Sequence, residues 1–481
     1  MGMLAPQCEQ NLARSESEPQ VSCQRDGDGE ASIPYLPEDI WRHIHSLMPM
    51  DAAARAACLS HTFLNSWRCY PRLDLNPGTL CSKTDWRHFR CRVDSILRNH
   101  SGIGLKILKL NLCFEKISCF PYLDTWLQAA VTPGIEELTL WLDAEYNFPC
   151  SLLSAEGVRD SVRSVHLSSC TFRPMSELGL LRSLTRLSLR DHLDIHYCNE
   201  IVLLKIPSVL QQLSYLQVIG RENPQVVENN APNLSRFFLG VMGKVIKLCL
   251  GEASQKAMKD FSLCRSRNAV SYALAELPSI MPNLESLVLS SLPEVHTPPM
   301  LPTKFLNLKH LVIHIWGGTI SQPYDYFSLV SFLEASPSLE TWCLNVYQDR
   351  EEHESVFNGG SLHLRQLPEH LKLKSVEIVG FRSAKMLVEL TCRIVKCAVS
   401  LERLTLNTFD GFSRCSEKNN SDCRDYMCRP ISKAELEEAS RAVVAITRYI
   451  EDLVPPTAKL TVVEPCPCPR CRHSTPVSGA R

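Results

Sequence analysis

Residues 284–289 read LESLVL, and the same spacing of apolar residues returns along most of the chain. Clean copies of this L-x-x-L-x-L phrase also begin at Leu105, Ile135, Leu184 and Leu401. Weaker copies begin at Val162, Leu213, Leu234, Val245, Leu308, Leu339 and Leu373. Neighbouring copies lie 24 (Leu284 to Leu308), 27 (Ile135 to Val162) or 30 (Leu105 to Ile135) residues apart, which is close to the period of a leucine-rich repeat. The step of 39 residues from Val245 to Leu284 predicts an insertion there.

The phrase also predicts which side chains are buried. Side chains of a strand alternate between its two faces, so the first, fourth and sixth residues point into a core while the third, fifth and seventh face outward. A single unit cannot bury its apolar side alone, but a stack of about a dozen can. The predicted fold class is therefore α/β, with a leucine-rich-repeat solenoid over residues 105–410 whose parallel sheet lines the concave side.

A different pattern precedes the repeats. Residues 36–67 read LPEDIWRHIHSLMPMDAAARAACLSHTFLNSW and contain no copy of the phrase. Pro37 suits the first turn of a helix, and Ile40, Ile44 and Leu47 follow at helical spacing, which predicts a helix with one apolar face. Two or three short helices in about 40 residues make a marginal domain, which would gain most from a partner.

The remaining boundaries follow from composition. Residues 1–32 are polar and acidic, which predicts disorder. The predicted order is then a helical unit (33–75), a connecting helix (76–104), the solenoid (105–410), a polar loop (411–431), a helix-strand cap (432–464) and a mobile tail rich in Cys and Pro (465–481).

Two segments resemble parts of plant F-box proteins. The helical unit is similar to an F-box that opens with Leu-Pro-Glu-Asp-Ile and closes with Cys-Leu-Ser before an aromatic run, and the matching residues are Leu36, Pro37, Ile40, Leu47, Cys58, Leu59, Ser60 and Trp67. It departs from that pattern at His61–Phe63, where relatives carry basic residues and then Trp. Residues 371–410 resemble the FBD segment that follows leucine-rich repeats in such proteins.

This resemblance implies a function. F-box proteins of this kind are substrate-recognition adaptors of SCF-type ubiquitin ligases, in which the F-box binds a Skp-type adaptor and, through it, a cullin. The residues that it assigns to adaptor binding are Leu36, Pro37, Ile40, Ile44, Leu47, Leu59 and Trp67. The alternative is a leucine-rich-repeat scaffold that is not coupled to a ligase, whose N-terminal helices only cap the solenoid.

The outward positions of the repeats are the predicted binding surface for an unknown protein target. We single out Trp141, Arg186, Arg190, His310 and His314 there, because aromatic and arginine side chains contribute much of the energy of protein interfaces. An ordinary solvated strand face would show the same pattern. The chain has 51 Lys and Arg against 52 Asp and Glu, so we expect no nucleic-acid partner.

Other function classes lack their sequence signals. No apolar run approaches the roughly 20 residues of a membrane helix, so we expect no membrane partner and an intracellular protein of the nucleus, the cytoplasm or both. The 22 cysteines are interpreted as thiols. Cys466, Cys468, Cys471 and His473 have ligand chemistry for zinc, but the prolines between them and their terminal position favour an unliganded tail. We predict no metal, no cofactor, no catalytic residue and thus no enzyme.

Overall fold

The computed structural model describes residues 36–80, 86–101, 103–112, 120–172, 181–190, 203–220, 226–241, 247–265, 268–291, 304–317, 324–348, 354–358, 362, 369–409 and 431–465. The segments predicted as a disordered N-terminus, a polar loop and a mobile tail fall outside these ranges, except for Ile431 and Pro465.

Most described strands follow the repeat phrase. They are β1 (Arg72–Leu75), β2 (Ile107–Leu112), β3 (Glu137–Asn147), β4 (Ser164–Thr171), β5 (Arg186–Arg190), β6 (Leu203–Ile206), β7 (Tyr215–Gly220), β8 (Val226–Asn229), β9 (Arg236–Val241), β10 (Lys247–Leu250), β11 (Asp260–Arg265), β12 (Ser286–Ser291), β13 (His310–Gly317), β14 (Thr341–Gln348), β15 (Ser375–Val379), β16 (Arg403–Asn407) and β17 (Lys459–Val463).

The helices lie before, between and after the strands. They are α1 (Glu38–Leu47), α2 (Met50–Ala57), α3 (His61–Trp67), α4 (Pro77–Leu80), α5 (Trp86–Asn99), α6 (Phe120–Ala130), α7 (Ser151–Ser154), α8 (Val158–Ser161), α9 (Glu252–Ala257), α10 (Ala269–Ile280), α11 (Val330–Ala335), α12 (Lys385–Cys397) and α13 (Lys433–Tyr449), with 3-10 turns η2 (Tyr326–Leu329) and η4 (Glu451–Leu453).

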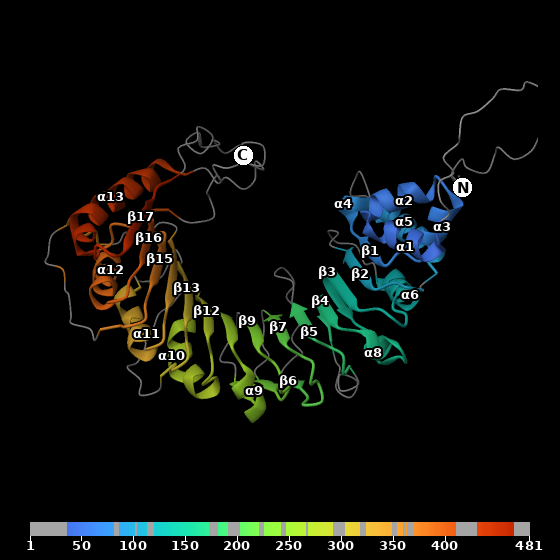
Figure 1. Ribbon diagram of the computed structural model, residues 1–481, viewed down its shortest axis with the longest axis horizontal. Coiled ribbons are helices and arrows are strands. Elements are labelled where there is room, and N and C mark those ends of the chain that lie inside the picture. Colours follow the sequence, from blue (N-terminus) through green and yellow to red (C-terminus); the bar gives the residue numbers. More distant parts are fainter. Residues whose placement is uncertain are drawn as a thin grey trace, which may run out of the picture.

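One large sheet organises the molecule. Its 14 described strands run in the order β1-β2-β3-β4-β5-β7-β9-β11-β12-β13-β14-β15-β16-β17, and neighbours pair in parallel. The sheet lines the inner side of an arch, and helices such as α6, α8, α10 and α12 lie on its outer side (Figure 1). The predicted α/β solenoid with a parallel concave sheet is confirmed. A second sheet, β10-β8-β6, is also parallel and lies on the convex side.

Alternation along the strands places the core as the repeat phrase predicts. In the copy that begins at Leu105, the first, fourth and sixth residues are fully buried, and one continuous apolar core runs from the N-terminal helices to α13. Gly380, in the turn after β15, has φ of +75° and lies so close to the carbonyl of Val346 that a Cβ would clash. Only glycine fits both requirements at this position.

The predicted insertion after Val245 is wrong. The Val245 stretch forms β10 of the convex sheet, and the repeat of the large sheet begins instead at Met258, 24 residues after Leu234 and 26 before Leu284. Met258 and Phe261 are buried where other repeats have leucine. The repeat period is therefore regular here, and substitution of leucine by other large apolar residues hides it.

The large sheet begins earlier and ends later than the leucine phrases indicate. β1 pairs with β2 and lies inside the 33–75 segment, so the helical unit and the solenoid share one core. At the other end, β17 pairs with β16 and α13 lies over the last repeats.

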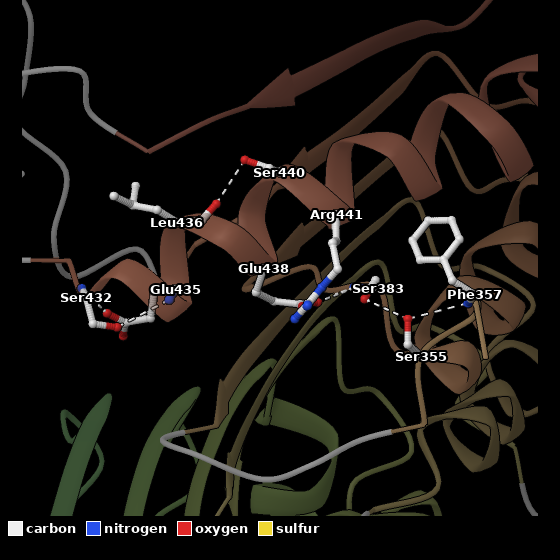
Figure 2. A network of polar contacts seen from close by, with 9 residues as sticks. All are labelled: Ser355, Phe357, Ser383, Ser432, Glu435, Leu436, Glu438, Ser440 and Arg441. Atoms are coloured by element: carbon white, nitrogen blue, oxygen red, sulfur yellow. Dashed lines mark hydrogen bonds and ion pairs between the residues drawn. The ribbon is translucent and has the colours of Figure 1, made fainter.

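The C-terminal cap is held by satisfied polar contacts. Ser432 and Glu435 form a capping box at the start of α13, the helix of the predicted C-terminal cap. Farther along the helix, Glu438 is buried and accepts a hydrogen bond of 2.7 Å from the backbone N–H of Ser383, and it also accepts two from Arg441 (Figure 2). This carboxylate ties α13 to the segment that leads into α12.

Candidate functional site

The N-terminal helices pack around a cluster of rings. His45 is fully buried and lies 5.3 Å from the ring of Phe63 and 5.8 Å from that of Tyr70, centroid to centroid. Trp67 stacks on Tyr70 at 5.3 Å, and Trp41 meets Phe63 edge to face at 5.4 Å. These rings fix α1 against α3, because a close-packed aromatic cluster tolerates little rearrangement.

The outward side of this unit exposes apolar side chains. Ile40, Ile44 and Leu47 lie on one face of α1 at helical spacing and are exposed, with Leu47 at 72%. Leu59, in the turn between α2 and α3, is 83% exposed. We call these four residues the docking patch. Pro37 is exposed beside them in sequence and Leu36 is half-buried, so six of the seven residues assigned to adaptor binding reach the surface.

Trp67 is the exception. It is only 8% exposed and packs against His45 and Tyr70, so it holds the unit together and does not belong to the docking patch. The helical spacing of Trp67 is compatible with either the buried or the exposed face of α3. Its stacking on Tyr70 places it on the buried face. We therefore reassign Trp67 from contact with an adaptor to the core.

The departure at His61–Phe63 is accommodated. Ser60 caps α3 by accepting a hydrogen bond of 3.2 Å from the N–H of Phe63. The half-buried Phe63 ring contacts both Trp41 and His45, so it packs against the ring cluster of the unit.

The concave face carries the predicted target residues in two separate groups. Trp141 on β3 and Arg190 on β5 lie in the same row of the sheet, with Ser168 of β4 between them, and Arg186 opens β5. Trp141 is 47% exposed and both arginines are exposed. His310 and His314 lie on β13, five strands beyond β5, which corresponds to roughly 24 Å at the usual strand spacing. The structure therefore joins the first three residues and separates the histidines from them.

The histidine group includes two aromatic residues that sequence reasoning missed. Trp316 stacks on Tyr347 at 4.1 Å, and His314 lies parallel to the same ring at 6.1 Å. The indole N–H of Trp316 donates to Ser290 at 3.1 Å. Burial lowers the pKa of His314, so this side chain is neutral at pH 7. The sequence contained a signal for Trp316, because this residue lies two positions after His314 and so continues the alternation of outward-facing side chains.

Charge is distributed unevenly over the first half of the concave face. Lys109 and Glu137 form an ion pair of 3.2 Å. Burial lowers the pKa of His166, the carboxylate of Glu137 opposes this shift, and the guanidinium of Arg186 adds to it. His166 also shares a hydrogen bond of 2.9 Å with Ser164. His166 therefore lies among charges of both signs, with burial as the main cause of its lowered pKa.

The described residues offer no alternative centre for metal chemistry. They contain no group of three or more His, Cys, Asp or Glu placed to hold a metal ion. The zinc candidates Cys466, Cys468, Cys471 and His473 lie outside the described residues. The ten cysteines within them are not in disulfide bonds, and none of their helices is both long and apolar enough to cross a membrane.

The fold and this site define a leucine-rich-repeat protein with a helical N-terminal unit. Residues 96–467 match the family described as the At1g61320/AtMIF1 LRR domain, and the chain belongs to that family. The match begins after α1–α3, so it covers the concave face and not the docking patch.

Curated relatives from Arabidopsis thaliana carry the F-box name. The chain is 22% identical over 216 residues to the F-box protein At5g03100, 24% over 249 to the putative F-box protein At1g49610, and 26% over 133 to the putative F-box/LRR-repeat protein At5g02700. These alignments cover 41%, 48% and 26% of this chain, and they span 66%, 62% and 26% of the relatives. The plant F-box/leucine-rich-repeat resemblance is confirmed.

Among solved structures, an internalin (inlF) from Listeria monocytogenes aligns with a TM-score of 0.31 and 12% identity, over 75% of this chain and 82% of that chain.

Proposed function

We propose that this protein is the substrate-recognition adaptor of an SCF-type ubiquitin ligase. The observation that carries the proposal is the docking patch, since four apolar side chains are exposed on a helical unit that has its own packed interior. Clustered apolar exposure of this kind marks an interaction site. The F-box names of the curated relatives support the same assignment.

The mechanism is proximity. The docking patch binds a Skp-type adaptor and, through it, a cullin, while the concave face holds a protein target. One continuous core joins the two surfaces, so the target is presented at a fixed place relative to the ligase. Holding two reactants together raises their effective concentration and needs no catalytic residue on this chain.

A non-catalytic role agrees with the chemistry of the concave face. Cys343, one of the cysteines on the strands of this face, is half-buried on β14, and burial raises the pKa of its thiol to about 11. A thiol that stays protonated at pH 7 is a poor nucleophile. As part of the same proposal, the protein acts inside the cell, in the nucleus, the cytoplasm or both.

Co-purification with a Skp-type adaptor and a cullin tests the docking step. The wild-type chain is expected to bind, and the pair Ile44→Asp and Leu47→Asp is expected to abolish binding, because charge replaces two exposed apolar contacts. Val444→Asp on α13 is the matched control, since Val444 is 55% exposed at the opposite end of the sheet. Leu36→Ala with Pro37→Ala is a second disruptive pair. A wild-type chain that fails to bind, under conditions where related F-box proteins do, overturns the proposal.

The competing function is a leucine-rich-repeat scaffold that is not coupled to a ligase. One observation favours it: α1–α3 share the core of the solenoid and cover its first strand, so they already have a structural use. The two functions differ in one measurable property. A scaffold keeps its targets when the docking patch is mutated and does not change their ubiquitination, whereas a ligase adaptor keeps the targets but loses their ubiquitination.

A further inference from the structure

Several lysines along the large sheet are paired with a carboxylate in a neighbouring repeat. Along one edge of the described sheet, lysine and glutamate alternate at the second position of the repeat phrase. The pairs are Lys106 with Glu136 (2.6 Å), Lys259 with Glu285 (3.2 Å), Lys309 with Glu285 (2.9 Å) and Lys374 with Glu340 (3.5 Å). The charge of these lysines is therefore compensated by neighbouring repeats of the solenoid.

Three arginines on the concave face behave differently. Arg186 and Arg190 on β5 and Arg236 on β9 are exposed, and we call them the arginine cluster. None of the three side chains has a hydrogen bond within the described structure or a carboxylate within 4.0 Å. Arg186 and Arg236 lie in one row of the sheet, with Tyr215 of β7 between them.

On the strands that carry the cluster the described outward positions contain no acid, and an acid lies on the neighbouring strand β11, where Asp260 is the register partner of Arg236. Across β4, β5, β7 and β9 the described outward residues include three arginines and no carboxylate. Carboxylates appear only at the two ends of the row, where Glu137 is paired with Lys109 and Asp260 follows Arg236. The whole chain has a formal charge of -1, so three exposed arginines on neighbouring strands are a local feature of the described sheet.

The spacing of the cluster suits a short extended segment. Two strand intervals separate Arg186 from Arg236, which is roughly 10 Å, and four residues along β5 separate Arg186 from Arg190, which is roughly 13 Å. An extended peptide covers these distances in about three to four residues. Carboxylates at that spacing could each meet one guanidinium, and the exposed ring of Trp141 lies in the row of Arg190, where it can cover an apolar neighbour.

We propose that the arginine cluster binds a short acidic segment of the target protein, with Asp or Glu three to four residues apart and an apolar residue against Trp141. The inference rests on the proposed use of the concave face for target binding. A nucleic acid fits less well, because it needs a continuous basic stripe and this row ends in Glu137 and Asp260.

The proposal is tested by selecting binders of the purified full chain from a displayed library of random peptides. The peptides have about 12 residues, so they span about 40 Å when extended. The expected pool is enriched in Asp or Glu at a spacing of three to four relative to the starting library. The triple variant Arg186→Gln, Arg190→Gln and Arg236→Gln should bind the selected peptides at least about tenfold more weakly. A pool without this enrichment, or equal affinity of the variant, overturns it.

The control variant removes the same charge from the convex side. Lys205→Gln, Lys247→Gln and Lys256→Gln change three exposed lysines on β6, β10 and α9, and peptide affinity should stay unchanged. Circular dichroism checks that both variants fold. Equal weakening by both variants would assign the effect to overall charge and overturn the site.

A further arm measures a labelled single-stranded RNA of about 20 nucleotides. RNA binding that the arginine variant loses, without acidic enrichment among peptides, would assign the cluster to nucleic acid instead. The library selection uses no ligase component, so failure of adaptor docking leaves its result intact, and failure of the selection leaves the docking result intact.

Discussion

Helices cover both ends of the large sheet, but the two caps leave different surfaces. At the C-terminal end, α13 buries Ala442, Ala445 and Ile446, and Val444 is its one large apolar side chain that is mostly exposed in the described structure. At the N-terminal end, α1 and the α2–α3 turn expose the four residues of the docking patch.

This difference separates a structural requirement from a functional one. A solenoid needs both ends covered, and α13 shows that this can be done with an amphipathic helix, a capping box and one buried carboxylate. The apolar surplus at the N-terminal end exceeds that requirement. Side chains of this size each contribute about 1.5–3 kcal/mol when fully buried, so covering the patch with a partner, as proposed above, would be favourable.

Loss of the aromatic interior should have the largest effect on the N-terminal cap. Trp67→Ala removes a buried ring stacked on Tyr70 and is expected to cost about 3–5 kcal/mol of unfolding free energy, as measured by urea denaturation followed by circular dichroism. Leu47→Ala is the control and should change stability by about 0.5 kcal/mol or less, since Leu47 is exposed. Similar costs for both variants would contradict the separation of core from patch.

The C-terminal cap should depend on one carboxylate. Glu438→Ala leaves the backbone N–H of Ser383 and the guanidinium of Arg441 without their acceptor, which is expected to cost about 1–3 kcal/mol by the same measurement. Glu437→Ala removes an exposed neighbour whose ion pair with Lys433 is 3.6 Å long, and should cost about 0.5 kcal/mol or less. If Glu438→Ala behaved like Glu437→Ala, α13 would be held by apolar packing alone.

The exposed surfaces of the two caps should differ in self-association more than in stability. Leu47→Ser with Leu59→Ser is expected to reduce concentration-dependent association of the free chain, with a stability change of about 0.5 kcal/mol or less. Light scattering over a concentration series measures this. Val444→Ser on α13 should leave association unchanged, and an equal reduction by Val444→Ser would remove the distinction between the caps.

Acidification should produce the smallest difference, confined to the N-terminal side. His100 bonds to the carbonyl of Tyr70 at 2.9 Å, and burial lowers its pKa, with that hydrogen bond opposing the shift. The unfolded chain then binds a proton at His100 more readily than the folded chain does. The contribution of neutral His100 to the free energy of unfolding is therefore fully present above about pH 6.5 and declines as the pH falls below it.

Hydrogen exchange at pH 7.5 and 5.5, corrected for intrinsic rates, should therefore show more opening around β1 at the lower pH. Residues 431–465 contain no histidine and provide the internal reference. Equal changes in both caps would exclude His100 as the cause.

Sequence patterns anticipated much of this architecture because they are local. The L-x-x-L-x-L copies and the helical spacing of Ile40, Ile44 and Leu47 each depend on neighbours within about one strand or two helical turns. The leucine pattern missed repeats in which another large apolar residue takes the place of leucine in the core. Met258 and Phe261 are one case, and Tyr70, which opens the first repeat inside the helical unit, is another.

The sequence by itself determined the class of protein, the alternation that puts leucine inside, and the residue types available on the outside. Only the tertiary structure decided which of those outer residues meet. It placed Trp67 in the core through Tyr70, set His310 five strand positions from Arg186, and added Trp316 and Tyr347 to His314. It also brought three exposed arginines together on neighbouring strands. The physical reason is that these relations join residues far apart in the chain, and they are set by strand order and register across the sheet.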